Sequence, residues 1–147
     1  MKVRQISIPL VNKPGALHSV IETLNQSNVC IRAFTVDNVN GVNKLRGIAD
    51  NVIWIAALLK EAGVDVTINE VLIVEARESE CELFVVHELL RSAGITVCCA
   101  YPIMSSKSRL FGKIMSMVFE VDDIDRAVNL LQNKGFTLLS QEHISSL

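Results

Sequence analysis

The chain has 147 residues and half of them are apolar, which is enough to bury the core of one ordinary domain or of two small ones. The formal net charge of -2 leaves no excess of lysine and arginine to hold a phosphate backbone, so nucleic acid is not an expected partner. The N-terminus carries no long apolar run that ends in small residues, and no segment approaches the roughly 20 apolar residues of a membrane span, so we expect a cytoplasmic protein with no membrane partner.

Two different periods of apolar residues indicate the first strand and the first helix. Apolar residues alternate with polar ones over residues 6–10, which predicts a strand with one buried face. The next apolar residues have the spacing of an amphipathic helix, and they are Leu17, Val20, Ile21 and Leu24. Asn28 comes soon after and readily takes the left-handed conformation, so we expect it to end this helix.

A hairpin and a second helix are predicted to follow. Residues 29–33 and 42–49 have the pattern of two strands, and the Asn- and Gly-containing segment 37–41 between them is typical of a turn. Asp50 or Asn51 then offers a side-chain oxygen to the first turn of a helix formed by the apolar run after it. The order of elements up to this point is strand, helix, strand, strand, helix.

The second half of the chain repeats the first. The β-branched segment 64–76 is too long for one strand of a small domain, so we expect two successive strands, with a domain boundary between Asn69 and Glu70. Beyond it, a shift of 66 positions matches the helix and strand patterns of the two halves, and after the predicted hairpin the shift becomes 72. The six extra residues of the second copy lie near residues 105–113, because hairpins accept insertions.

Each half therefore has the order βαββαβ, the ferredoxin-like plan of an antiparallel sheet with both helices on one face. We predict an α+β fold with a first domain over residues 1–69 and a second over residues 70–147. Packed side by side, the two units would form one eight-stranded antiparallel sheet with the helices on one face, because this pairing removes two exposed strand edges. The interface between the units is where we expect a ligand.

The predicted turn between the first strand and the first helix carries a family resemblance. Residues 12–17 are Asn-Lys-Pro-Gly-Ala-Leu. Together with the βαββαβ repeat, this turn resembles that of tandem ACT domain proteins, in which a pattern close to Asn-x-Pro-Gly precedes a helix that starts Ala/Val-Leu. The resemblance covers both halves of the chain. It implies a regulatory module, not an enzyme, that binds a small ligand, usually an amino acid, at the interface between two units.

The residue types of this turn suit an amino-acid ligand. Pro14 would fix φ in the first turn of the helix, and Gly15 would let a carboxylate approach the backbone N–H groups at the positive end of the helix. Asn12 offers both a donor and an acceptor to a ligand that carries carboxylate and ammonium groups on one carbon. The alternative interpretation is that Asn12 only caps the helix and that Pro14 and Gly15 only turn the chain.

The resemblance also implies a partner for the turn. In amino-acid-binding relatives, the turn Asn faces a polar residue at the start of the second strand of the opposite unit, and the shift of 66 places Thr96 and Cys30 at these positions. We therefore predict a ligand-binding set of Asn12, Lys13, Pro14, Gly15, Ala16, Leu17 and Thr96. The second turn departs from the pattern, so we expect one good site per chain; there Glu78, Glu80 and Cys81 replace Asn, Pro and Gly.

Other constellations support a simpler interpretation. Four carboxylates near Arg77 and His87 could serve a small enzyme, but acidic residues in the first turn of a helix are favoured by the helix dipole, and we predict a non-catalytic protein; they are Glu75, Glu78, Glu80 and Glu82. The four cysteines lack a CxxC pair and a matching histidine spacing, so we expect no metal site. No GxGxxG or P-loop is present, so we expect no nucleotide cofactor.

The function expected from the sequence is that of a stand-alone regulatory or sensor protein that binds a small amino acid and changes how it engages a partner. The alternative is a docking or regulatory subunit of an amino-acid biosynthetic enzyme in which the ligand site is vestigial. The helix predicted over residues 52–59 is apolar nearly all round, more than one sheet face can cover, so we also predict a homodimer.

Overall fold

The computed structural model describes residues 1–105 and 113–146 of the chain. They divide into two compact units, each described by itself below. The N-terminal unit is Arg4–Asn69, and the C-terminal unit is Met1–Val3 with Glu70–Leu147. None of the helices in the described ranges is both long enough and apolar enough to cross a membrane.

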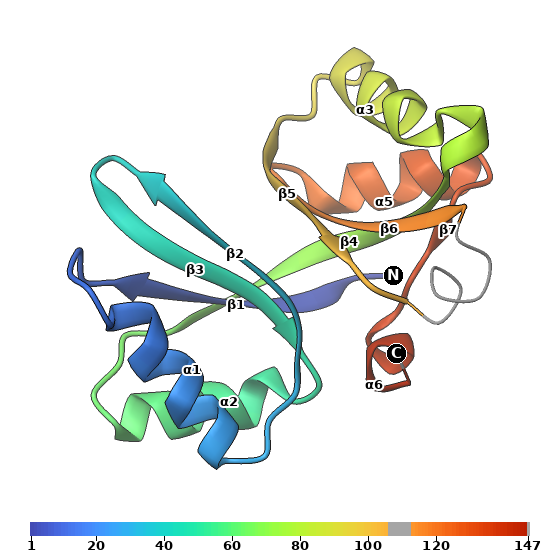
Figure 1. Ribbon diagram of the computed structural model, residues 1–147. Helices are drawn as coiled ribbons and strands as arrows, with labels where there is room; N and C mark the ends of the chain where they lie inside the picture. The colour runs from blue at the N-terminus through green and yellow to red at the C-terminus, as the bar shows by residue number, and fades with distance from the viewer. Residues whose placement is uncertain (106–112, 147) are drawn as a thin grey trace. The chain divides into compact units, whose positions relative to one another are not determined.

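The N-terminal unit is an antiparallel sheet with two helices on one of its faces (Figure 1). Its β3 pairs antiparallel with both neighbours, so that Ile8 and Val36 lie on either side of Leu45. Alternate residues of the first strand face the helices and form the core with apolar residues of both helices. The elements are β1 (Val3–Leu10), α1 (Ala16–Gln26), β2 (Ile31–Val39), β3 (Val42–Ala49) and α2 (Val52–Glu61).

The C-terminal unit repeats this plan. Its β4 lies between β6 and β7, and β6 also pairs with β5, all antiparallel, with α3 and α5 on one face of the sheet (Figure 1). The core residues include Leu90 and Leu131. The elements are β4 (Thr67–Arg77), the 3₁₀ turn η1 (Glu78–Glu80), α3 (Glu82–Ser92), β5 (Val97–Ile103), β6 (Ile114–Val121), α5 (Ile124–Asn133), β7 (Thr137–Leu138) and α6 (Gln141–Ser145).

The α+β, antiparallel character of the prediction is confirmed, but the described residues contain seven strands and not eight. We expected two successive strands in 64–76, whereas the structure has the single strand β4. No Gly or Pro interrupts this β-branched segment, so nothing in it ends the strand. The predicted domain boundary at Asn69 falls inside this strand and stays a prediction, and most of the predicted insertion, at residues 106–112, lies outside the described ranges.

The internal repeat extends to the backbone conformation. Helices α1 and α3 are followed by Asn28 and Gly94, which have φ of 55° and 73°. Helices α2 and α5 begin after Asn51 and Asp123, whose side chains accept a hydrogen bond from the backbone N–H three residues later. The predicted helix end at Asn28 and the predicted cap at Asn51 are therefore both present.

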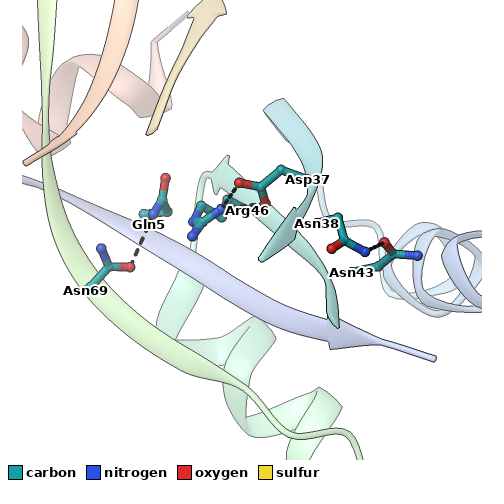
Figure 2. A network of polar contacts seen from close by, with 6 residues as sticks. All are labelled: Gln5, Asp37, Asn38, Asn43, Arg46 and Asn69. Carbon is teal, nitrogen blue, oxygen red and sulfur yellow. Dashed lines mark hydrogen bonds and ion pairs between the residues drawn. The ribbon is translucent and has the colours of Figure 1, made fainter. Parts of the chain in front are cut away.

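The sheet face of the N-terminal unit that points away from its helices carries buried polar side chains. Arg46 on β3 makes an ion pair with Asp37 on β2, and Gln5 on β1 donates to Asn69 at 3.3 Å (Figure 2). The Arg46 side chain is only 9% exposed, and Gln5 is fully buried. Buried polar groups need partners, and Asp37 and Asn69 each supply one, although Arg46 Nε is buried without a hydrogen bond to any residue that the structure describes.

Candidate functional site

The turn from β1 to α1 is the predicted ligand-binding turn, and its backbone differs from the expectation. Pro14 and Gly15 lie in a turn before the helix, which begins at Ala16, so Pro14 is not in the first helical turn. Within the turn, Lys13 N–H donates to the Val11 carbonyl at 2.8 Å. Pro14 therefore shapes the approach to the helix and does not start it.

Gly15 suits the backbone conformation at this position. It is the N-cap of α1 and has φ of 86° and ψ of -6°, in the left-handed region. A Cβ added to it would meet no heavy atom within 4 Å, so the conformation, and not crowding, selects glycine here. Its carbonyl accepts from both the backbone N–H and the hydroxyl of Ser19 at 3.0 Å.

The N-terminus of α1 is left without a side-chain cap. Among the described residues no side-chain cap hydrogen bond is made at its start, the first turn contains no acidic residue, and the Ala16 N–H donates only to the Lys13 carbonyl, at 3.4 Å. The partial positive charge at a helix start is usually met by a capping oxygen or a carboxylate. In this turn Asn12, Lys13, Pro14, Gly15, Ala16 and Leu17 surround that positive end, and none of them supplies a carboxylate.

The Asn12 side chain is held by the β2–β3 hairpin. Asn43 Nδ2 donates to Asn12 Oδ1 at 3.3 Å, and Asn38 Nδ2 donates to Asn43 Oδ1 at 3.0 Å. Figure 2 shows Asn38 and Asn43 facing each other across the hairpin. The amide oxygen of Asn12, which we expected to accept from a ligand, therefore already has a donor.

Asn38 and Asn43 were not predicted from the sequence to contact this turn. The pairing of Asn38 with Asn43 could have been predicted from the Asn-Gly pair at residues 40 and 41. Both residues have positive φ, as a two-residue I′ turn needs, and this turn sets Asn38 opposite Asn43. The contact of Asn43 with Asn12 could not have been predicted, because it depends on the alignment of β1 with β3, which pairs Leu10 with Asn43.

The equivalent turn in the C-terminal unit is filled by its own side chains. Cys81 occupies the position of Gly15 and is also left-handed, with φ of 53°. Next to it, Glu82 accepts from the Arg77 backbone N–H at 2.6 Å and from the Arg77 guanidinium at 2.7 and 2.9 Å. These hydrogen bonds hold the pKa of Glu82 below its ordinary value, against the opposing effect of burial. The second turn thus carries an internal carboxylate at the start of α3.

Thr96 lies in the C-terminal unit, just before β5. Its backbone N–H donates to Asp122 Oδ1 at 2.9 Å, and its carbonyl accepts from the Asp122 N–H at 3.1 Å. It lines an open concavity of about 360 Å³ that also includes His87 and Arg91. The structure describes Thr96 and the Asn12 turn in different units, so their pairing stays a prediction. Cys30, the equivalent of Thr96, is exposed.

Two carboxylates of the acidic cluster line a different concavity from His87. Glu82 and Arg77 line one concavity of about 250 Å³, together with Glu75. His87 lines the other concavity, beside Thr96. Among the residues that the structure describes, no group of three or more His, Cys, Asp or Glu side chains could hold a metal ion.

Comparison with known proteins supports the fold and the resemblance. A protein from Bacteroides thetaiotaomicron is 24% identical, with a TM-score of 0.87 over 100% of this chain and 98% of that chain. The aspartate kinase regulatory subunit of Thermus thermophilus, in its ligand-free form, is 11% identical, with a TM-score of 0.58 over 90% and 92% of the two chains. That of Thermus flavus is 10% identical, with a TM-score of 0.59 over 88% and 90%. No curated protein matches.

These likenesses establish the fold, and the family follows from the whole sequence. The family model described as ACT domain pair matches residues 1–147. It covers both copies of the internal repeat and the turn at residues 12–17 on which the resemblance rests. This chain therefore belongs to the ACT domain pair family.

Proposed function

We propose that this protein is a non-catalytic regulator or sensor that binds a small amino acid. In this proposal the turn formed by Asn12, Lys13, Pro14, Gly15, Ala16 and Leu17 receives the ligand, and Thr96 of the opposite ACT-like unit completes the site. The proposed domains are residues 1–69 and 70–147. ACT domains are regulatory modules, and two structural relatives are regulatory subunits of aspartate kinase.

The observation that carries the proposal is the uncapped N-terminus of α1. A ligand carboxylate there would accept from backbone N–H groups that no side chain of the turn neutralises, and the charge of Lys13 would favour it. The second turn differs in charge, because the first turn of α3 contains Glu82, whose carboxylate accepts from the Arg77 N–H. We therefore expect one ligand site per chain, at the first turn.

A thermal-shift screen against the twenty amino acids tests the proposal, because a ligand that binds only the native state raises the melting temperature. Isothermal titration of each hit then measures variants of the two turns. Asn12→Ala should weaken binding by about 1–3 kcal/mol, the loss of a hydrogen bond to a charged group. Glu78→Ala, at the equivalent position of the second turn, is the matched control and should leave the affinity unchanged. Equal losses would show that both turns bind ligand.

The alternative is a docking subunit for an amino-acid biosynthetic enzyme, with a vestigial ligand site. The exposed apolar residues of α2 favour a protein partner, since Ile53 is 55% and Trp54 is 46% exposed. A homodimer would cover the same residues. Sedimentation equilibrium of the wild type and of Ile53→Glu separates these ideas, because only a dimer through α2 is lost in the variant. A screen without a hit, together with copurification of an enzyme, would favour the docking subunit.

A further inference from the structure

The orientation of the Asn12 amide is set by a chain of hydrogen bonds that starts at a backbone group. Gly41 N–H donates to Asn38 Oδ1 at 3.0 Å. A backbone N–H can only donate, so Asn38 must present its oxygen to Gly41 and its Nδ2 to the next residue. The amide directions along this chain therefore follow from a donor whose identity is certain.

Asn43 and Asn12 continue this chain of hydrogen bonds, and the orientation of each amide fixes that of the next. Asn38 Nδ2 donates to Asn43 Oδ1 at 3.0 Å, which leaves Asn43 Nδ2 to donate to Asn12 Oδ1 at 3.3 Å. In the described ranges no protein acceptor bonds to Asn12 Nδ2. The Asn12 side chain thus presents two N–H donors outward and has its oxygen occupied.

We infer that Asn38 and Asn43 are positioning residues that make Asn12 a donor-only contact for an anionic oxygen of the ligand. The inference rests on the proposed function, and it refines it: Asn12 recognises the carboxylate and not the ammonium group. The uncapped start of α1 adds N–H donors of the same kind. The ammonium group must then meet a different acceptor.

The chain of asparagines also predicts a selectivity. A carboxylate oxygen accepts from Asn12 Nδ2 as an ion, whereas an amino-acid amide offers only a neutral oxygen, so the acid should bind about 10-fold better than its amide. Asn43→Asp reverses the end of the chain. The carboxylate introduced by this substitution has no N–H or O–H group to donate at neutral pH. The Asn12 amide must therefore rotate so that its Nδ2 donates to this carboxylate. The rotated Asn12 amide then presents its oxygen to the ligand.

The experiment compares each amino acid that binds the wild type with its own carboxamide, by isothermal titration. Asn43→Asp should weaken binding of the amino acid about 10-fold or more and weaken binding of its carboxamide less. The preference for the acid over the amide should therefore narrow or reverse. Asn43→Leu, which only frees Asn12, should weaken the acid about 2- to 10-fold. Asn40→Asp is the matched control: it adds the same charge to the same hairpin, tolerates positive φ and takes no part in the chain of hydrogen bonds. It should keep the wild-type preference.

Two outcomes would overturn the inference. Parallel losses for acid and amide in Asn43→Asp would indicate a general structural defect, and an equal change in Asn40→Asp would indicate charge alone.

A ligand-free measurement decides the orientation of the Asn12 amide if no amino acid binds. An NMR coupling from Asn43 Nδ2 to Asn12 Cγ across the hydrogen bond supports the inferred direction, even though the proposed function would then fail. A coupling from Asn12 Nδ2 to Asn43 Cγ overturns it.

Discussion

Gly15→Ala should destabilise the N-terminal unit through backbone conformation alone. Gly15 has φ of 86°, and a left-handed residue with a Cβ costs about 1–2 kcal/mol. No steric term is added, because the new Cβ has no heavy atom within 4 Å. Alanine also lowers the conformational entropy of the unfolded chain, which offsets the loss by stabilising the folded state by about 0.4–1 kcal/mol. We therefore expect a net loss of about 1 kcal/mol in the free energy of unfolding.

Urea unfolding followed by fluorescence measures this loss where it occurs. Trp54 is the single tryptophan of the chain and lies on α2, in the same unit as Gly15. Gly15→Asn is the control, because asparagine tolerates the left-handed region and should lose less than alanine. Cys81→Gly tests the same idea in reverse, since Cys81 adopts φ of 53° at the equivalent position, and it should not destabilise. A Gly15→Ala protein as stable as the wild type would refute the argument.

Three further predictions follow from the contacts. Glu82→Gln should be less stable than the wild type above the ordinary carboxyl pKa of 4.5, and this difference should disappear as the pH falls through the lowered pKa of Glu82. Arg77→Leu should remove the same pH-dependent part of the unfolding free energy, measured by acid-titration unfolding curves. Asp37→Ala should lower the unfolding free energy by about 3 kcal/mol in urea, because it leaves the buried Arg46 without that carboxylate, and a loss below about 1 kcal/mol would contradict a buried ion pair. Asn51→Ala and Asp123→Ala should each cost about 1 kcal/mol in thermal unfolding by removing a helix cap, whereas Asn133→Ala, at a helix end without a capping role, should change little.

The parts of the fold that sequence predicted well are those set by short-range chemistry. Asn28 ends α1 and Asn51 caps α2 because each acts on residues only a few positions away. The repeat shifted by 66 also holds, since Leu24 and Leu90 are both buried core residues of their units. A periodic pattern repeated twice in one chain constrains the element order more strongly than either copy alone.

The parts that sequence missed depend on conformation or on distant pairing. The Pro-Gly pair did not reveal that Gly15 is left-handed, because such pairs occur in several turn types. Because of this conformation, Gly15→Glu would combine backbone strain with blockage of the ligand, so a loss of binding in that variant would have two causes. The contact of Asn43 with Asn12 needed the alignment of β1 with β3, which no local pattern supplies.

The two strand-to-helix turns show that the same backbone can carry opposite electrostatic character. Both have a left-handed residue before the helix, Gly15 in one and Cys81 in the other. They differ in the charge of the first helical turn: Glu82 lies in the first turn of α3, and α1 has no acidic residue there, although neither N-cap makes a side-chain hydrogen bond within the described ranges. Backbone conformation therefore cannot be what distinguishes a binding turn from a structural one. In the proposed function the distinguishing feature is a helix start without an acidic residue, which in this chain lies close to Asn12.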